Sequence, residues 1–224
     1  MKQRFERLNE LAKINSASKY LEIGVADGTT FINVNVPYKV AVDPNFMFSF
    51  KEIANHETIF HEVTSDLFFS SLASQYSKFD LIYLDGLHTF EQTFRDFCAS
   101  LAYSHANTMW LIDDTCPSSR LASIPNQKLV SGLRKVLQIK DKRWMGDVFK
   151  IVFAIHDFFP QFDFYTFPGH GQTVIFNKPR KEFSPKINSL SKISKLRYGD
   201  FLQYRNSLFS ITEPSFIIES LNYK

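Results

Sequence analysis

The sequence predicts an α/β fold with a doubly wound, mostly parallel seven-stranded sheet, helices on both of its faces and a helical extension at the C-terminus. Short apolar runs of strand length alternate along the chain with segments whose apolar residues recur at helical spacing. Several runs are almost continuously apolar, which is typical of parallel strands buried on both faces. This alternation indicates a Rossmann-like domain over residues 1–178, followed by an extension over residues 179–224.

Composition narrows the class of protein. A length of 224 residues fits one large domain, and a hydrophobic content of 44% is enough for a full core. The formal net charge of +3 is too small to indicate a nucleic-acid partner. Cys98 and Cys116 make neither a disulfide framework nor a metal knuckle, so we expect a reducing, cytoplasmic environment. No stretch approaches the ~20 apolar residues of a membrane-spanning helix, and we expect no signal peptide.

The first half of the chain supplies three strands and two helices. Apolar residues at helical spacing, namely Phe5, Leu8, Leu11 and Ile14, predict an amphipathic helix. Apolar runs predict strands at residues 19–25, 38–43 and 57–66. A further short helix should begin at residue 28, the second of two glycines four positions apart.

The second half begins with the clearest strand, residues 79–86. The helix expected after it, at residues 88–102, carries a stripe of phenylalanines. The remaining expected elements are a strand at 108–114, helices at 127–139 and 146–159, and closing strands at 161–167 and 171–178. The extension is basic and serine-rich, and should form one or two helices that pack on the domain, on the second subunit of a homodimer or on another partner.

Polar residues follow the expected strands at the points where they end. They are Glu22 and Gly24, then Asp43, Asp66 with Ser65 beside it, Asp85, and finally Asp113 with Asp114. In an open α/β sheet, ligands bind outside the carboxyl ends of the strands. Acids that end five successive strands should therefore meet along one edge and form the functional site.

The turn after the first strand, "YLEIGVADGTTF", has Gly24 and Gly28 with Ala26 between them. A dinucleotide site would need a third glycine, and a phosphate-binding loop would need a lysine after the second one, so both are disfavoured. The pattern E-x-G-x-x-x-G, with an acid ending the next strand, resembles the class I S-adenosylmethionine-dependent methyltransferases. This resemblance implies a nucleoside and amino-acid site along the glycine turn.

The resemblance also implies roles for single residues around that cofactor. Glu22 would orient the turn and the amino group, and Asp43 would accept hydrogen bonds from the ribose hydroxyls. Ser65 and Asp66 would lie beside the adenine. Gly24, Ala26, Gly28 and Asp85 complete the predicted cofactor-binding set.

Later residues resemble a bacterial subgroup, methyltransferase family 24, in the pattern D-G-x-H-x-x-E-x-x-x-x-D. The matching residues are Asp85, Gly86, His88, Glu91 and Asp96, followed by Asp113 and Asp114 and then by Trp144, Gly146 and Asp147. Members of the subgroup often end the fifth strand with His-Asp, whereas this chain has two aspartates. Since members are often associated with glycan or natural-product tailoring, the resemblance implies a sugar hydroxyl on a glycan or glycosylated metabolite as the acceptor.

The paired aspartates also resemble the metal site of the catechol-type O-methyltransferases. That second resemblance implies Mg²⁺ bound by Asp85, Asp113 and Asp114, which supply the oxygen ligands that this cation prefers. His88 takes the place of their general-base lysine, and its ordinary pKa of about 6.5 suits proton removal. Alternatively, the acids cap turns or hold the acceptor without a metal.

Weaker candidates and rival functions remain open from the sequence. Glu91, Trp144, Asp147 and His170 are candidate acceptor-binding residues, and each could equally have a purely structural role. The rivals are a catechol or polyketide O-methyltransferase, a non-catalytic scaffold that keeps the cofactor fold, and an NAD-dependent enzyme. The sequence does not distinguish methylation of oxygen from methylation of nitrogen or carbon.

Overall fold

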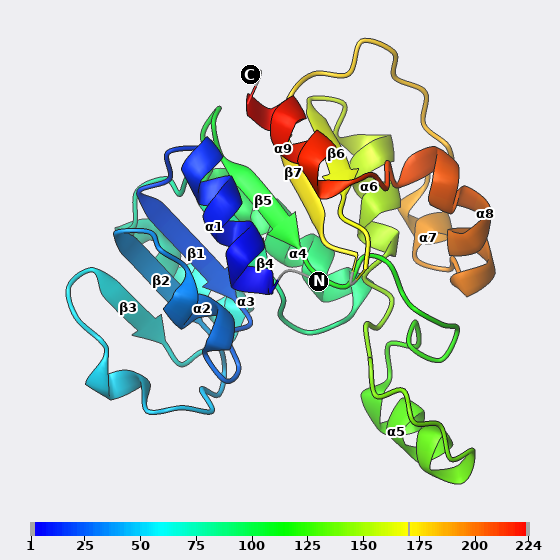
Figure 1. Ribbon diagram of the computed structural model, residues 1–224, viewed down its shortest axis with the longest axis horizontal. Coiled ribbons are helices and arrows are strands. Elements are labelled where there is room, and N and C mark those ends of the chain that lie inside the picture. The colour runs from blue at the N-terminus through cyan, green and yellow to red at the C-terminus, as the bar shows by residue number, and fades with distance from the viewer. Residues whose placement is uncertain (1–2, 170, 223–224) are drawn as a thin grey trace.

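The computed structural model describes residues 3–169 and 171–222, and it confirms the doubly wound α/β fold (Figure 1). The described residues form a seven-stranded sheet in the order β3-β2-β1-β4-β5-β7-β6. The strands are β1 (Lys19–Ile23), β2 (Tyr38–Val42), β3 (Thr58–His61), β4 (Leu81–Leu84), β5 (Met109–Ile112), β6 (Phe162–Thr166) and β7 (Thr173–Asn177).

Six strands run in one direction and β7 runs against them, between β5 and β6. The connection from β6 to β7 is too short for a crossover, so these two strands form an antiparallel hairpin. As a result, the carboxyl ends of β1 to β5 and the amino end of β7 share one edge of the sheet. This edge is where the predicted site residues should meet.

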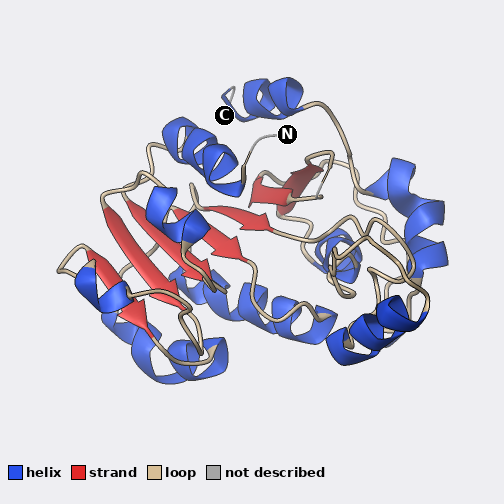
Figure 2. Ribbon diagram, turned by 60° about the horizontal axis from the view of Figure 1, so that its bottom comes forward, coloured by secondary structure: helices blue, strands red, loops and turns tan. Residues whose placement is uncertain are grey.

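Helices cover both faces of the sheet (Figure 2). The helices of the described residues are α1 (Arg4–Ile14), α2 (Thr29–Asn33), α3 (Ser65–Leu67), α4 (Phe90–Ser100), α5 (Gln127–Val136), α6 (Lys150–Phe158), α7 (Leu190–Ile193), α8 (Tyr198–Leu208) and α9 (Pro214–Asn222), of which α5 stands away from the sheet. Alternate strand residues face opposite cores, as the two-residue period of a strand requires. Ile82 and Leu84 pack with α4, α6 and α8, whereas Leu81 and Tyr83 pack with α1, α2 and α9.

The third strand is shorter than predicted, because β3 ends at His61 and α3 begins at Ser65. Thr64 explains the difference, since its side chain accepts a hydrogen bond from the backbone N–H of Leu67 and so caps the short helix. Ser65 and Asp66 therefore lie at a helix start rather than at a strand end. The helices predicted at 127–139 and 146–159 are also shorter than predicted, and span Gln127–Val136 and Lys150–Phe158.

The described part of the C-terminal extension, up to residue 222, forms three helices, one more than predicted, and packs on the domain. Helices α7 and α8 contact α6, and α9 contacts α1. Ile193, Phe201 and Ile217 from these helices are buried in the two cores. The domain boundary at residue 178 stays a prediction. Among the described residues, no helix combines the length and apolar character needed to cross a bilayer.

Gly24 allows the turn after β1 to lie directly against the end of β4. Its φ of +88° is in the left-handed region, and a Cβ at this position would lie 2.1 Å from the backbone oxygen of Asp85. Its N–H donates to Val42 O at 2.9 Å, which fastens the turn to β2 as well. A side chain at residue 24 would push three strands apart at the edge that carries the acids.

The Gly24→Ala substitution should therefore lower the free energy of unfolding by more than about 2 kcal/mol, because it adds left-handed strain to a backbone clash. Gly132→Ala in α5 is the matched control, since a Cβ there would meet no atom within 4 Å. The control should leave stability unchanged or raise it by up to about 1 kcal/mol. Urea unfolding of both variants measures the difference, and equal stabilities would contradict the close approach.

Candidate active site

A cavity of about 630 Å³ opens at the carboxyl edge of the sheet, between the ends of β1, β2 and β4 and the start of α3. The structure brings seven of the eight predicted cofactor residues to its wall, together with His88. These seven are Glu22, Gly24, Ala26, Asp43, Ser65, Asp66 and Asp85. Gly28 lies outside the wall. Its own φ is +79°, and a Cβ there would lie 2.7 Å from the ring of Phe48, so its role is in the start of α2.

Asp43 holds the glycine turn in place. Its Oδ2 accepts hydrogen bonds from the backbone N–H groups of Val25 at 2.8 Å and Ala26 at 2.9 Å, and its Oδ1 accepts one from Asn45 at 2.8 Å. The carboxylate is almost fully buried. Sequence analysis missed this structural role, although an acid one strand after a glycine turn is the signal for it. The predicted contact with a ribose stays a prediction, and a carboxylate has acceptor positions left for it.

Glu22 lies at the floor of the cavity, with its side chain buried. Desolvation raises the pKa of this carboxyl well above its usual range, and the hydrogen bond from the hydroxyl of Tyr20 (2.5 Å) opposes the rise. A carboxyl in this setting gains free energy from any cationic group that enters the cavity.

His88 lies between two carboxylates at the rim of the cavity, on the loop that joins β4 to α4. Its Nε2 is 3.5 Å from Asp85 Oδ1, and its Nδ1 is 3.0 Å from Asp114 Oδ2 and 3.1 Å from the backbone oxygen of Trp144. The rings of His88 and Trp144 stack, with centroids 4.7 Å apart. Asp114 has a φ of +60°, an uncommon conformation for a non-glycine residue at the end of a strand. One ligand atom each from Asp85, His88 and Asp114 lies within 4.8 Å of the others.

This arrangement changes the proton affinity of its members. Desolvation opposes a charged imidazole, but the carboxylates of Asp114 and Asp85 outweigh it and raise the pKa of His88 to about 10. Desolvation, with repulsion from Asp113 and Asp85, raises the pKa of Asp114 to about 7, although His88 opposes the change. Desolvation and repulsion from Asp113 also raise the pKa of Asp85.

Asp113 has partners of its own. Its Oδ2 accepts hydrogen bonds from Nε of Arg4 and from the hydroxyl of Tyr83, the latter at 2.9 Å. Its Oδ1 is buried and accepts no hydrogen bond from any residue that the structure describes. The structure therefore groups His88, rather than Asp113, with Asp85 and Asp114.

Arg4 and Arg7, which were not among the residues predicted from the sequence, enter this edge of the sheet from α1. Arg7 is buried, lies over the ring of Phe167 and donates to Gln172, whose amide reaches the Tyr83 hydroxyl at 3.4 Å. Desolvation lowers the pKa of Arg4, but Asp113 and Asp85 outweigh it and the net change is a rise. A signal was available, because Arg4 continues the buried stripe of Leu8 and Leu11 at helical spacing.

The predicted adenine-side residues meet α4 at the cavity edge. Gln92 Nε2 donates to Ser65 Oγ at 3.1 Å and to Asp66 Oδ1 at 3.2 Å. Arg95 lies 2.9 Å from Asp66 Oδ2 in an exposed ion pair. Side chains of α4 therefore hold both Ser65 and Asp66 in place.

Of the weaker acceptor-binding candidates, the structure places one, Trp144, beside His88. Asp147 is buried, accepts a hydrogen bond from the N–H of Phe90 at 2.8 Å and pairs with Lys150 at 2.6 Å, so its observed contacts are structural. Glu91 is exposed and lies outside the cavity wall. His170 lies outside the described residues.

Comparison with known proteins agrees with this geometry. Residues 21–115 match the family Methyltransf_24, described as a methyltransferase domain. Solved structures with the same fold include an O-methyltransferase from Bacillus cereus in complex with SAH (16% identity, TM-score 0.54, covering 78% of this chain and 81% of that one). Another is TomG from Streptomyces achromogenes, an O-methyltransferase involved in tomaymycin synthesis, in complex with SAM (15% identity, TM-score 0.55, covering 80% of this chain and 82% of that one). A third is SAH-bound PaMTH1, a methyltransferase from Podospora anserina (16% identity, TM-score 0.55, covering 80% of this chain and 80% of that one).

No curated protein gives a significant match to this sequence. At these identities the solved structures establish the fold, and the family match covers the glycine turn and the acids of the first five strands. The family match over residues 21–115 and the shared fold agree with the resemblance to the class I S-adenosylmethionine-dependent methyltransferases of family 24.

Arg4→Gln should lower the free energy of unfolding by about 1–3 kcal/mol, because it leaves the buried carboxylate of Asp113 without its counter-ion. The expected loss of free energy is smaller than for a fully buried ion pair, because the Arg4 side chain is 44% exposed. Arg143→Gln is the matched control, since it breaks an exposed pair with Asp141 and should cost less than about 0.5 kcal/mol. Urea unfolding compares them, and an equally small loss for Arg4→Gln would contradict its role.

Proposed function

We propose that the protein transfers a methyl group from S-adenosylmethionine to a hydroxyl oxygen. The observation that carries the proposal is the position of His88, held by Asp85 and Asp114 at the rim of the cavity that contains the predicted cofactor residues. The structural neighbours described as O-methyltransferases support oxygen as the accepting atom.

The residues at the cavity suit this cofactor. The turn at Gly24 provides close backbone approach, and Glu22 is a buried carboxyl whose desolvation an ammonium group would offset. Asp43, Ser65 and Asp66 provide polar contacts for a nucleoside further along the wall. When bound, S-adenosylmethionine supplies an electrophilic methyl group and leaves as S-adenosylhomocysteine.

The contribution of the chain is orientation and proton transfer. We infer that the rim around His88 and Trp144 receives the acceptor, with its oxygen directed into the cavity. Positioning of this kind supplies most of the acceleration when the electrophile is already reactive. The hydroxyl proton passes to the imidazole of His88, and Asp85 and Asp114 stabilise the imidazolium that results.

We propose Mg²⁺ as an assisting ion at the same rim. Asp85 and Asp114 present carboxylate oxygens within 4.8 Å of one another, which are ligands of the kind that Mg²⁺ prefers. Asp113, the third residue of the predicted metal set, directly precedes Asp114 in the chain. His88 would keep its role as the base, since imidazole suits other metals better. When bound, the ion would lower the pKa of the acceptor hydroxyl.

For the acceptor we propose a sugar hydroxyl on a glycan or glycosylated metabolite, which rests on the resemblance to methyltransferase family 24. A small catechol or polyketide acceptor is the second candidate, and the similarity to TomG favours it. A cytoplasmic location and a homodimer stay predictions.

The pH dependence of methyl transfer tests His88 as the base. Its pKa of about 10 means that it is protonated at neutral pH, so the neutral, base-competent fraction increases as pH rises. In EDTA, the release of S-adenosylhomocysteine on an active sugar or catechol acceptor should rise by roughly tenfold per pH unit from pH 7 and level off near pH 10. Bound Mg²⁺ repels the imidazolium and should shift this rise to lower pH.

His88→Gln should lower kcat about 100-fold or more and leave the Kd for S-adenosylmethionine nearly unchanged. Glu91→Gln, on the same segment but outside the cavity wall, should change neither. A plateau above about pH 7 would assign the proton transfer to Asp114 instead, and unaltered turnover in His88→Gln would remove His88 from the mechanism. Cofactor binding without turnover on any acceptor, with or without Mg²⁺, would favour a scaffold protein.

A further inference from the structure

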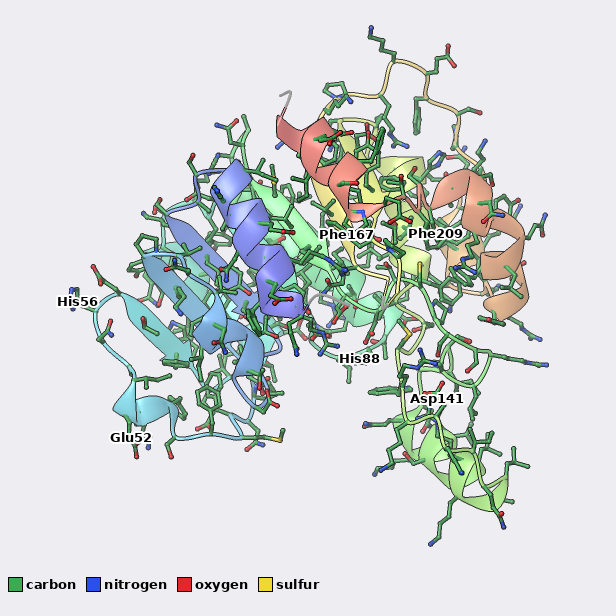
Figure 3. All side chains as sticks on the ribbon, in the orientation of Figure 1. Glu52, His56, His88, Asp141, Phe167 and Phe209 are labelled. Atoms are coloured by element: carbon green, nitrogen blue, oxygen red, sulfur yellow. The ribbon has the colours of Figure 1, made fainter. Side chains whose placement is uncertain are left out.

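Residues 127–143, which we call the basic arm, project from the body of the molecule. The arm consists of α5 and the segment that returns from it toward Trp144 (Figure 1). Figure 3 shows Asp141 out on this arm and His88 between the arm and the strands. Within α5, Val130 is the side chain that is fully buried.

Positive charge is concentrated on this arm. It contains six cationic side chains, namely Lys128, Arg134, Lys135, Lys140, Lys142 and Arg143, and a single acidic one, Asp141. The arm therefore carries a net charge of +5, whereas the whole chain carries +3, so the remainder of the chain is net negative at −2. A surface with this distribution attracts anionic surfaces through one projecting element.

The same arm exposes large apolar side chains. Leu129 and Val136 lie seven residues apart on one face of α5, with 52% and 79% of their surfaces exposed, and Leu137 beyond the helix is 60% exposed. A Cβ at Gly132, which lies on this face between them, would meet no atom within 4 Å. The described residues therefore leave this face of the helix open to solvent.

The combination of positive charge with an exposed apolar face distinguishes the arm from the other basic segment, the C-terminal extension. In that extension Arg180 is held by the backbone oxygens of His156 and Phe159, and apolar residues such as Ile193 are buried in the core. In α5 the apolar face is open and Lys128 and Lys135 lie on the side next to it. A helix with an exposed leucine and valine stripe beside lysines is typical of helices that lie in the plane of a bilayer surface.

We propose that the basic arm docks on an anionic phospholipid surface, with Leu129 and Val136 entering the boundary between headgroups and acyl chains. The lysines beside this stripe would contact lipid phosphates. This surface adjoins the active-site rim, because Arg134 donates to the backbone oxygens of Lys142 and Arg143, directly before Trp144, which stacks on His88. Docking holds the rim of the cavity close to the membrane. The inference does not depend on the identity of the acceptor.

Co-sedimentation of the full chain with vesicles tests the proposal. Wild-type protein should bind phosphatidylcholine vesicles that contain phosphatidylglycerol, should not bind pure phosphatidylcholine, and should dissociate as salt increases. Lys128→Gln with Lys135→Gln should weaken binding by roughly fivefold per lysine. Lys192→Gln with Lys195→Gln, exposed lysines of the extension, is the matched control and should change it by less than about twofold.

A second set of variants tests whether the apolar side chains of the arm contribute to vesicle binding. Leu129→Gln with Val136→Gln should weaken binding by about tenfold or more, whereas Leu202→Gln on α8, where Leu202 is as exposed as Leu129, should leave it unchanged. Gly132→Leu should strengthen binding relative to Gly132→Ala, because it extends the apolar stripe and both variants have similar helix propensity. Circular dichroism checks that each variant is folded.

The outcomes separate clearly. Failure of the wild-type protein to bind anionic vesicles would overturn the proposal, as would equal binding by the arm variants and their controls. Binding that depends on the lysines but is indifferent to Leu129, Gly132 and Val136 would also overturn it, because the arm would then recognise an acidic polymer rather than a bilayer interface. Methyl transfer is not measured in these assays, so their failure leaves the proposed reaction untouched.

Discussion

The burial of several carboxylates at one edge of the sheet is the constraint on which the rest of the site depends. Parallel strands bring Glu22, Asp85, Asp113 and Asp114 to that edge, where each is at most slightly exposed. An uncompensated charge in such a position costs several kcal/mol. The chain compensates in two ways. His88 lies between Asp85 and Asp114, and Arg4 pairs with Asp113. The base proposed for catalysis is thus also a counter-ion of the folded state.

The same constraint explains why segments outside the strands belong to the site. Helix α1 delivers Arg4 and Arg7 to the edge, and α9 of the extension packs against α1. The basic C-terminal extension therefore packs, through α9, against the helix whose Arg4 pairs with Asp113. On the other side of the rim, Trp144 joins His88 to the basic arm. Charge compensation and the proposed proton acceptor therefore lie at the same rim, and Trp144 connects this rim to the arm that carries the proposed membrane contact.

Much of the fold could be predicted from the sequence, because strand length, apolar runs and glycine turns are local signals. The sequence also predicted that Glu22, Asp43 and Asp85 lie close together, since the carboxyl ends of parallel strands meet at one edge of the sheet. Other features had only weak signals in the sequence, because the partners themselves are set by long-range contacts. The pairing of Asp113 with Arg4 joins residues more than a hundred positions apart, and the hydrogen bonds of Asp43 to the turn require the packed strands. The strand predicted to reach Asp66 was too long because the cap at Thr64 was not recognised.

The central claim is that the cavity at the carboxyl edge binds S-adenosylmethionine. Isothermal titration calorimetry of the full chain with S-adenosylmethionine, and separately with NAD, tests this claim most directly. The account predicts saturable binding of S-adenosylmethionine at one site per chain and no binding of NAD, because the glycine turn lacks the third glycine that a pyrophosphate needs. It also predicts that Gly24→Ala removes the binding. Absence of heat with S-adenosylmethionine, or tighter binding of NAD, would contradict the account.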